Sequence, residues 1–324
     1  MHAFRFVSRL AVVLLISFAT AVMAEEVWFA PPDNLDRGPR SYNKDFPSLF
    51  DESPAWSARA DVFVLSPKFT EEASEQMQKR ISSFLEKRHI ALAVGIGAVQ
   101  MDHVERTEGE CGLGVEGYTR PNKNQIIFSR LKRWGCDVQY VAMDEPLSFG
   151  HHYRHKNACN FSIQEVAKRV AATAMEIRKV YPKVKFVDYE SVASTKPAKE
   201  WLIDLQAWLA AYRQAAGELP DAMVFDVDWN KPWLDAVRPG IELLHRNGMR
   251  AGIFLTGTGP GKSDAEAVAA YRKNIDSVDA AKLPLDIVVI ANWTPHPANN
   301  LPESDPNSLS GVFHYYMTKH ARAK

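Results

Sequence analysis

The chain has 324 residues and no formal net charge, because 39 lysines and arginines balance 39 aspartates and glutamates. A chain of this length can bury a large core, and one α/β barrel of this size is ordinary. The balanced charge, with no basic stripe interleaved with aromatics, argues against a nucleic-acid partner.

The first residues resemble a secretory signal peptide. Arg5 and Arg9 precede an apolar stretch at residues 10–19, and small side chains follow before Glu25. The apolar stretch is about ten residues long, whereas a membrane-spanning helix needs roughly 20. We therefore predict a signal peptide at residues 1–24 that is cleaved at its end, rather than a retained membrane anchor. The mature protein is expected to be secreted or periplasmic, with no membrane span.

Residues 25–60 are rich in proline, aspartate, serine and arginine, and we predict an irregular lead that wraps the domain. From residue 61 onward, apolar runs alternate with helical patterns. The predicted strands are residues 61–65, 90–94, 138–143, 184–189, 222–227, 249–255 and 286–291. The predicted helices are residues 70–88, 121–134, 162–180, 198–216, 232–247, 262–279 and 306–320. Strands this apolar are buried on both faces, which in such an alternation indicates a parallel sheet.

Seven strand–helix units are one short of a (β/α)8 barrel. We place the missing third strand at residues 113–117, within a connection that would otherwise be unusually long. An open, doubly wound sheet is the competing architecture. It would need a glycine-rich turn after its first strand, and residues 64–72 contain no glycine. The sequence therefore predicts an α/β fold, with a (β/α)8 TIM barrel at residues 61–324.

Three cysteines, Cys111, Cys136 and Cys159, allow one disulfide and leave one thiol. Their spacing does not choose the pair. No Cys-x-x-Cys pattern occurs, which disfavours a zinc ribbon or a thioredoxin-type site.

Acidic side chains end four neighbouring predicted strands. They are Glu116, Asp144, Glu145, Asp188, Glu190, Asp226 and Asp228. In a TIM barrel, the C-terminal strand ends and the loops after them build the active site. Residues two apart on a strand point to the same side, so we expect the acids of the fifth and sixth strands to face the barrel mouth. The residues expected to face the helices instead are Val187, Tyr189, Phe225 and Val227.

The fourth strand ends in MDEP at residues 143–146, which resembles the Asn-Glu-Pro strand ending of the large superfamily of (β/α)8-barrel glycoside hydrolases. FDVDW at residues 225–229 and the segment 292–306 are similar to exported, glycosidase-like barrels of bacteria. The resemblance implies cleavage of a glycosidic bond, with Glu145 as the general acid/base. Retaining members carry their nucleophile at the end of the seventh strand. Residues 253–257 contain no acid there, so the resemblance implies no nucleophile.

Glycoside hydrolysis uses two carboxyl groups, one protonated and one ionised. For the partner of Glu145 we predict Glu190 or Asp228. A separation of about 5 Å would imply retention and about 6.5–9.5 Å inversion, which fit Glu190 and Asp228 respectively. Aromatic faces can stack on sugar rings while acids bind hydroxyls. The predicted substrate-binding residues are Glu116, Asp144, Asp188, Asp226, Trp229, Trp293, His296 and His151.

We therefore predict an exported glycoside hydrolase that acts on a saccharide or polysaccharide and needs no cofactor or metal. A barrel that binds carbohydrate without cleaving it is one alternative, favoured by the missing acid on the seventh strand. A metal-assisted hydrolase of another bond is a second, based on His151, His152 and His155. The His-Glu-x-x-His pattern is lacking, and the glycines at residues 256–263 do not have the spacing of a phosphate loop.

Overall fold

The computed structural model describes residues 25–33, 45–51, 55–103, 109–192, 196–257 and 261–320. The predicted signal peptide lies outside these residues. Within the described ranges, no helix combines the length and the apolar character needed to cross a membrane.

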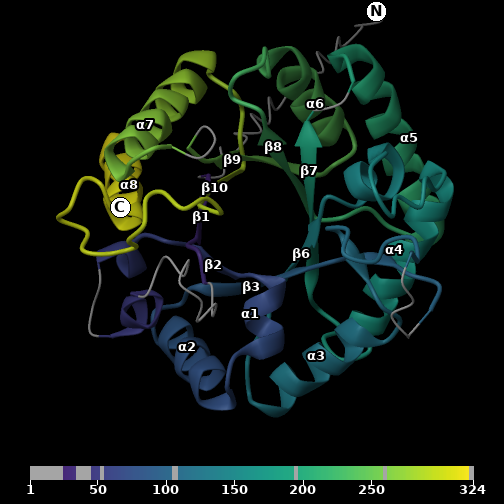
Figure 1. The fold of residues 1–324 in the computed structure, drawn as a ribbon, viewed down its shortest axis with the longest axis horizontal. Coiled ribbons are helices and arrows are strands. Elements are labelled where there is room, and N and C mark those ends of the chain that lie inside the picture. The colour runs from purple at the N-terminus through teal and green to yellow at the C-terminus, as the bar shows by residue number, and fades with distance from the viewer. Residues whose placement is uncertain are drawn as a thin grey trace, which may run out of the picture.

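Eight parallel strands close into a barrel at the centre of the molecule (Figure 1). In chain order they are β1 (Glu26–Ala30), β2 (Val62–Leu65), β3 (Ala91–Ile96), β6 (Tyr140–Asp144), β7 (Lys185–Val192), β8 (Ala222–Val227), β9 (Arg250–Leu255) and β10 (Ile287–Ala291). The barrel closes where β1 pairs with β10, in a register that sets Glu26 opposite Ile287. The predicted TIM barrel is confirmed, and each of the seven strands predicted from the apolar runs overlaps an observed barrel strand. A short second sheet pairs β4 (Val99–Gln100) with β5 (Tyr118–Thr119).

Helices surround the barrel in a ring (Figure 1). They are α1 (Pro67–Glu72), α2 (Glu75–Lys87), α3 (Lys123–Arg133), α4 (Ile163–Arg178), α5 (Ala198–Ala216), α6 (Leu234–Arg246), α7 (Asp264–Ala281) and α8 (Leu309–Lys319). Shorter 3-10 turns are η1 (Phe46–Phe50) and η2 (Ala55–Ala58), and η3 (Ser148–His152) is a turn of π-helix. Serine side chains accept a first-turn N–H at the starts of α1, α2, α4, α7 and α8. Such caps fix where each helix begins.

The buried side chains form two layers, because alternate residues of each strand point to opposite faces. The smaller cluster fills the barrel and includes Trp28, Tyr140, Tyr189 and Phe254. The larger cluster lies between the barrel and the helices. Each fully buried large apolar side chain contributes about 1.5–3 kcal/mol, so the two layers together hold the strand ends in fixed positions.

Two predictions about the strands are wrong. The first barrel strand, β1, lies within residues 25–60, which were predicted to be irregular; its centre, Val27 to Phe29, is fully buried. Residues 113–117 form turns and not the third strand. Gly112, Gly114 and Gly117 have φ angles of 82°, 73° and 77°, which no strand allows. The two errors offset each other, so β6 is the fourth strand as predicted.

Candidate active site

A cavity of about 670 Å³ opens at the C-terminal end of the barrel. Its lining comes from the ends of β1, β2, β6, β7, β8, β9 and β10 and from the loops that follow several of them. This is the end of the barrel at which enzymes of this architecture build their active sites.

Two carboxyl groups from different strands are hydrogen-bonded in this cavity. Glu145 directly follows β6, and Asp226 lies on β8. Burial, with repulsion from Asp226, Asp144 and Glu116, raises the pKa of Glu145 to about 9. Burial raises the pKa of Asp226 to about 6, and the hydrogen bond from Glu145 opposes that rise. At neutral pH, Glu145 therefore keeps its proton and donates it to an ionised Asp226. Environments that push two carboxyl pKa values apart are typical of acid–base pairs.

Two further acids, Asp144 and Glu116, line the same cavity. Burial and repulsion from Glu116 and Asp226 raise the pKa of Asp144 to about 7. Burial also raises the pKa of Glu116. Among the described residues neither carboxyl group has an ion-pair partner, so the two add negative charge around Glu145 and favour its protonated form.

The loop that carries Glu116 is held in place by contacts on both sides of that residue. Cys111 forms a disulfide with Cys159, and Cys136 is a buried free thiol, which settles the pairing left open by the sequence. Gly117 passes so close to the end of β6 that a Cβ atom there would lie 2.7 Å from the backbone oxygen of Asp144. Only glycine allows this approach, which sets Glu116 beside Asp144.

Glu145 has a strained backbone. Its φ angle is 43°, in the left-handed region that non-glycine residues seldom adopt, instead of the extended geometry expected before Pro146. The Glu145 N–H donates to the carbonyl of Tyr189 at 2.9 Å, and the Glu145 carbonyl accepts from Phe149 N–H at 2.9 Å. Such a conformation costs of order 1–3 kcal/mol and clusters at functional sites.

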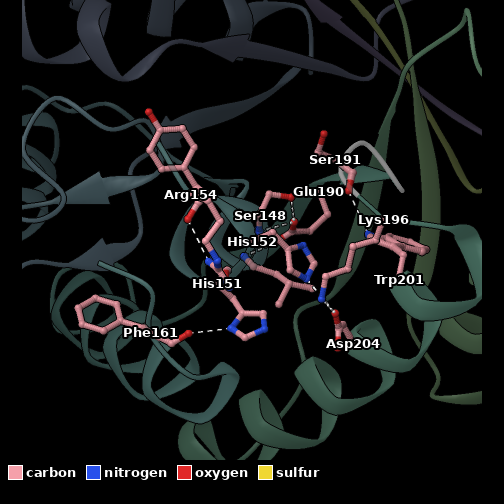
Figure 2. A network of polar contacts seen from close by, with 12 residues as sticks. Ser148, His151, His152, Arg154, Phe161, Glu190, Ser191, Lys196, Trp201 and Asp204 are labelled. Atoms are coloured by element: carbon pink, nitrogen blue, oxygen red, sulfur yellow. Dashed lines mark hydrogen bonds and ion pairs between the residues drawn. The ribbon is translucent and has the colours of Figure 1, made fainter. Parts of the chain in front are cut away.

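Glu190, a predicted catalytic partner, does not line the cavity. Its side chain is fully buried and accepts hydrogen bonds from Leu147 N at 2.5 Å, Ser148 N at 3.1 Å and Ser148 Oγ at 2.9 Å (Figure 2). Burial and the nearby carboxyls of Asp188 and Glu145 raise its pKa. Glu190 therefore anchors the turn that follows Glu145, from behind the site.

The prediction that Asp188 and Glu190 face the barrel mouth is wrong. Val187 and Tyr189 belong to the cluster inside the barrel, so the acids between and beyond them point toward the helices. Asp188 is fully buried and accepts a hydrogen bond from Trp208 Nε1 of α5 at 2.7 Å. A hydrogen-bonded carboxyl can occupy an otherwise apolar layer, which side-chain alternation alone does not reveal.

Asp228 and Trp229 lie outside the cavity. Asp228 is exposed, accepts a hydrogen bond from Asn230 N at 3.0 Å and forms an ion pair with Lys231 at 3.4 Å. Trp229 donates its Nε1–H to Thr256 Oγ1 at 3.1 Å and is partly buried. On β8, Asp226 therefore reaches the cavity, whereas Asp228 lies past the end of the strand.

Three aromatic rings form one wall of the cavity. Trp293, which follows β10, is 52% exposed and meets Phe254 edge-on at 5.5 Å. Phe254 in turn meets Tyr189 edge-on at 4.7 Å. His296, another predicted binding residue, lies outside the cavity lining, with its Nδ1 2.5 Å from Asp264 Oδ1.

The histidine loop forms polar contacts of its own (Figure 2), and neither His151 nor His152 lines the cavity. His151 Nδ1 is 2.7 Å from the Phe161 carbonyl, and His152 Nε2 is 3.0 Å from Asp204 Oδ2. Ligand atoms of both histidines and Asp204 lie within 4.8 Å of one another, as a metal site would require. The Lys196 ammonium, however, lies 2.6 Å from the same Asp204 oxygen and already supplies a positive charge there. Burial lowers the pKa of His152 to about 4, so His152 is neutral at pH 7.

Asp33 and Tyr189 are among the polar residues of the cavity that were not predicted from the sequence. Asp33 follows β1, accepts a hydrogen bond from Ser66 N at 2.6 Å, and has a pKa raised by burial to about 6. The acid directly after Pro31 and Pro32 would have been noticed had residues 26–30 been predicted as a strand. Tyr189 was assigned to the helix layer but lines the cavity.

Neither a family model nor a curated protein sequence matches this chain. A GH10 endoxylanase retrieved from a sugarcane soil metagenome has a similar structure, with a TM-score of 0.52 at 13% sequence identity over 84% of this chain and 86% of that chain. The intracellular xylanase of Thermoanaerobacterium saccharolyticum gives 0.48 at 10% identity over 84% and 87%. A 2,3-dimethylmalate lyase gives 0.44 at 12% identity over 91% and 78%. At such identities the likeness concerns the fold alone, and the chain shares the (β/α)8 barrel found in glycoside hydrolases.

Proposed function

We propose that the protein is a glycoside hydrolase in which Glu145 is the proton donor and Asp226 the second carboxylate. The observation that carries this proposal is the hydrogen-bonded pair with unequal pKa values in a cavity at the catalytic end of the barrel. The pair replaces the partners Glu190 and Asp228 predicted from the sequence. Trp293 and Phe254 offer the apolar wall on which a sugar ring can stack.

The short distance between the two carboxyl groups favours retention of configuration. Hydrogen-bonded oxygens lie about 2.5–3.0 Å apart, which is nearer to the about 5 Å between the carboxyls of retaining enzymes than to the about 6.5–9.5 Å by which inverting enzymes admit a water. In the first step Asp226 attacks the anomeric carbon, the glycosidic C–O bond breaks, and the leaving oxygen takes the proton of Glu145. In the second step Glu145 removes a proton from water, the water oxygen attacks the anomeric carbon, and the Asp226 carboxylate leaves.

The test is a hydrolysis screen against polysaccharides and oligosaccharides with reducing-end detection, run on the wild type, Glu145→Gln, Asp226→Asn and Asp228→Asn. General acid–base assistance is typically worth 10²- to 10⁴-fold, so Glu145→Gln should lower kcat by about that factor. Asp226→Asn should lower kcat at least as far, while Asp228→Asn, outside the cavity, should leave it within about twofold of the wild type. The first product should have the anomeric configuration of the substrate. Near-full turnover by Glu145→Gln or Asp226→Asn would refute the proposal.

A non-catalytic carbohydrate-binding barrel is the second candidate, because β9 ends at Leu255 and is followed by Thr256, so that no acid stands at this strand end. Binding of a glycan, with no turnover by the wild type under any condition of the screen, would favour this candidate.

We also propose, from the sequence of residues 1–24, that the chain is exported and cleaved before Glu25. Mass spectrometry of the protein recovered outside the cytoplasm should find Glu25 as the first residue. Recovery of the full-length chain from the cytoplasm alone would contradict this proposal.

A further inference from the structure

The cavity is lined by far more acid than base. Its acidic residues are Asp33, Glu116, Asp144, Glu145 and Asp226, and Lys68 is the one basic residue among the described residues of the lining. Carboxylates can accept hydrogen bonds from the hydroxyls of a neutral sugar, but five acidic side chains beside one base leave negative charge that a neutral sugar does not balance. The excess of carboxyl groups therefore points to a ligand that carries positive charge.

Three of these acids already form hydrogen bonds within the protein. Glu145 and Asp226 bond each other, and Asp33 accepts from the backbone N–H of Ser66 at 2.6 Å. Glu116 and Asp144 differ from these three, since neither has a hydrogen-bond or ion-pair partner among the described residues. Asp144 is partly buried and Glu116 is exposed, and two neighbouring carboxylates that repel each other gain from a cation placed between them.

A second observation points to a ligand at the same place. The hydroxyl of Tyr189 has no hydrogen-bond partner among the described residues, although the side chain is only 8% exposed and lines the cavity. A buried hydroxyl without a partner costs about 1–3 kcal/mol, so a ligand that bonds to it gains correspondingly. The half-exposed ring of Trp293 lies along the same wall and suits the apolar face of a pyranose.

We propose that the cavity takes a saccharide with a free ammonium group, that is, an amino sugar without its N-acetyl group, and that Glu116 and Asp144 bind the ammonium. This inference rests on the proposed function for the view that the ligand is a sugar. An acetamide would bring no charge to the two carboxylates, and a uronic acid would be repelled by them. Of these three kinds of sugar, only the amino sugar relieves the repulsion between Glu116 and Asp144.

The test compares methyl glycosides of glucosamine and galactosamine, as both anomers, with their N-acetyl and 2-hydroxyl counterparts and with methyl glucuronide. Dissociation constants are measured by ligand-observed NMR in EDTA. Charge-assisted hydrogen bonds predict that at least one amino glycoside binds about 10- to 100-fold more tightly than its two matched counterparts. Glu116→Gln and Asp144→Asn should each bring this ratio toward one. Asp228→Asn, which changes an acid outside the cavity, should leave the ratio unchanged.

Equal affinity across the matched glycosides, or tighter binding of the glucuronide, would overturn the inference. So would a preference that both variants retain, or one that appears only when Ca²⁺ or Mg²⁺ replaces EDTA, since a metal would then be the cation. The readout is binding, so it separates the two proposals. An amino-sugar preference without turnover would refute the hydrolase alone, and turnover of a neutral glycan without this preference would refute the inference alone.

Discussion

Replacing Glu145 by glutamine should stabilise the protein, and more so at alkaline than at acidic pH. Folding raises the pKa of Glu145 from 4.5 to about 9, so between these values the native state holds a proton that the unfolded chain has lost. The native state then binds more protons, and its stability falls as the pH rises through this window. Glutamine keeps the shape of the side chain and can still donate a hydrogen bond to Asp226, but its amide does not titrate between pH 5 and pH 8.

The size of the effect follows from the window. Each pH unit corresponds to about 1.4 kcal/mol for one proton, so a change from pH 5 to pH 8 gives a ceiling of about 4 kcal/mol. Asp226 and Asp144 share the repulsion with Glu145, so the effect is divided among the three groups. We therefore expect Glu145→Gln to gain about 2–4 kcal/mol more in free energy of unfolding at pH 8 than at pH 5. At pH 5, where Glu145 is protonated in the native state, the variant and the wild type should have nearly equal free energies of unfolding.

Equilibrium urea unfolding, followed by tryptophan fluorescence at pH 5 and pH 8, measures both free energies of unfolding. Subtracting the wild-type value at each pH removes the contributions of other buried acids, such as Glu190. Asp228→Asn, at an exposed position, should differ from the wild type by less than about 0.5 kcal/mol at both pH values. If Glu145→Gln gains no more stability at pH 8 than at pH 5, Glu145 is not held protonated by the fold, and its assignment as the proton donor loses its physical basis.

Three further changes test the surroundings of the pair. Trp293→Ala should raise KM more than it lowers kcat and should change the free energy of unfolding by less than about 0.5 kcal/mol, because the ring is half exposed; equal effects on both constants would contradict a stacking role. Gly117→Ala should lower the free energy of unfolding by more than about 1 kcal/mol and should lower activity, because its Cβ would meet the backbone at the end of β6. Gly114 has a φ of 73° and open space around it, so Gly114→Ala is the control for backbone strain alone. Replacing Cys111 and Cys159 by serine should lower the free energy of unfolding in urea by about 2–4 kcal/mol, because the disulfide closes a loop of 48 positions. An unchanged free energy of unfolding under oxidising conditions would contradict the pairing.

Much of the barrel could be predicted from the sequence because its strands are continuous apolar runs separated by helices. β1 was missed because its five residues stand between a targeting-like segment and a proline-rich stretch, with no helical pattern in the sequence directly after them. Residues 113–117 were mistaken for a strand because apolar spacing does not report φ. The three glycines around that segment have left-handed backbones, and only the folded loop requires them.

The candidate site was predicted in part. The strand ending at Asp144 and Glu145 was found because two acids and a proline interrupt an apolar run. The choice between Asp226, Asp228 and Glu190 was beyond the sequence, because alternation fixes which residues share a side but not which side that is. On β7 the answer depends on Trp208, a residue of α5 that donates a hydrogen bond to a buried carboxyl in the helix layer.

The seam of the barrel has a consequence for the order of folding. β1 pairs with β10 and β2, and the Tyr316 hydroxyl of α8 donates a hydrogen bond to Glu25, so the first and last strands of the barrel stabilise each other. Closing so long a loop is entropically costly, and pairing between distant segments slows folding. Until β10 has been synthesised, β1 and β9 each present an unpaired edge, and a chain truncated before β10 keeps both edges open to other chains. The last strand to be made is therefore the one that protects the first.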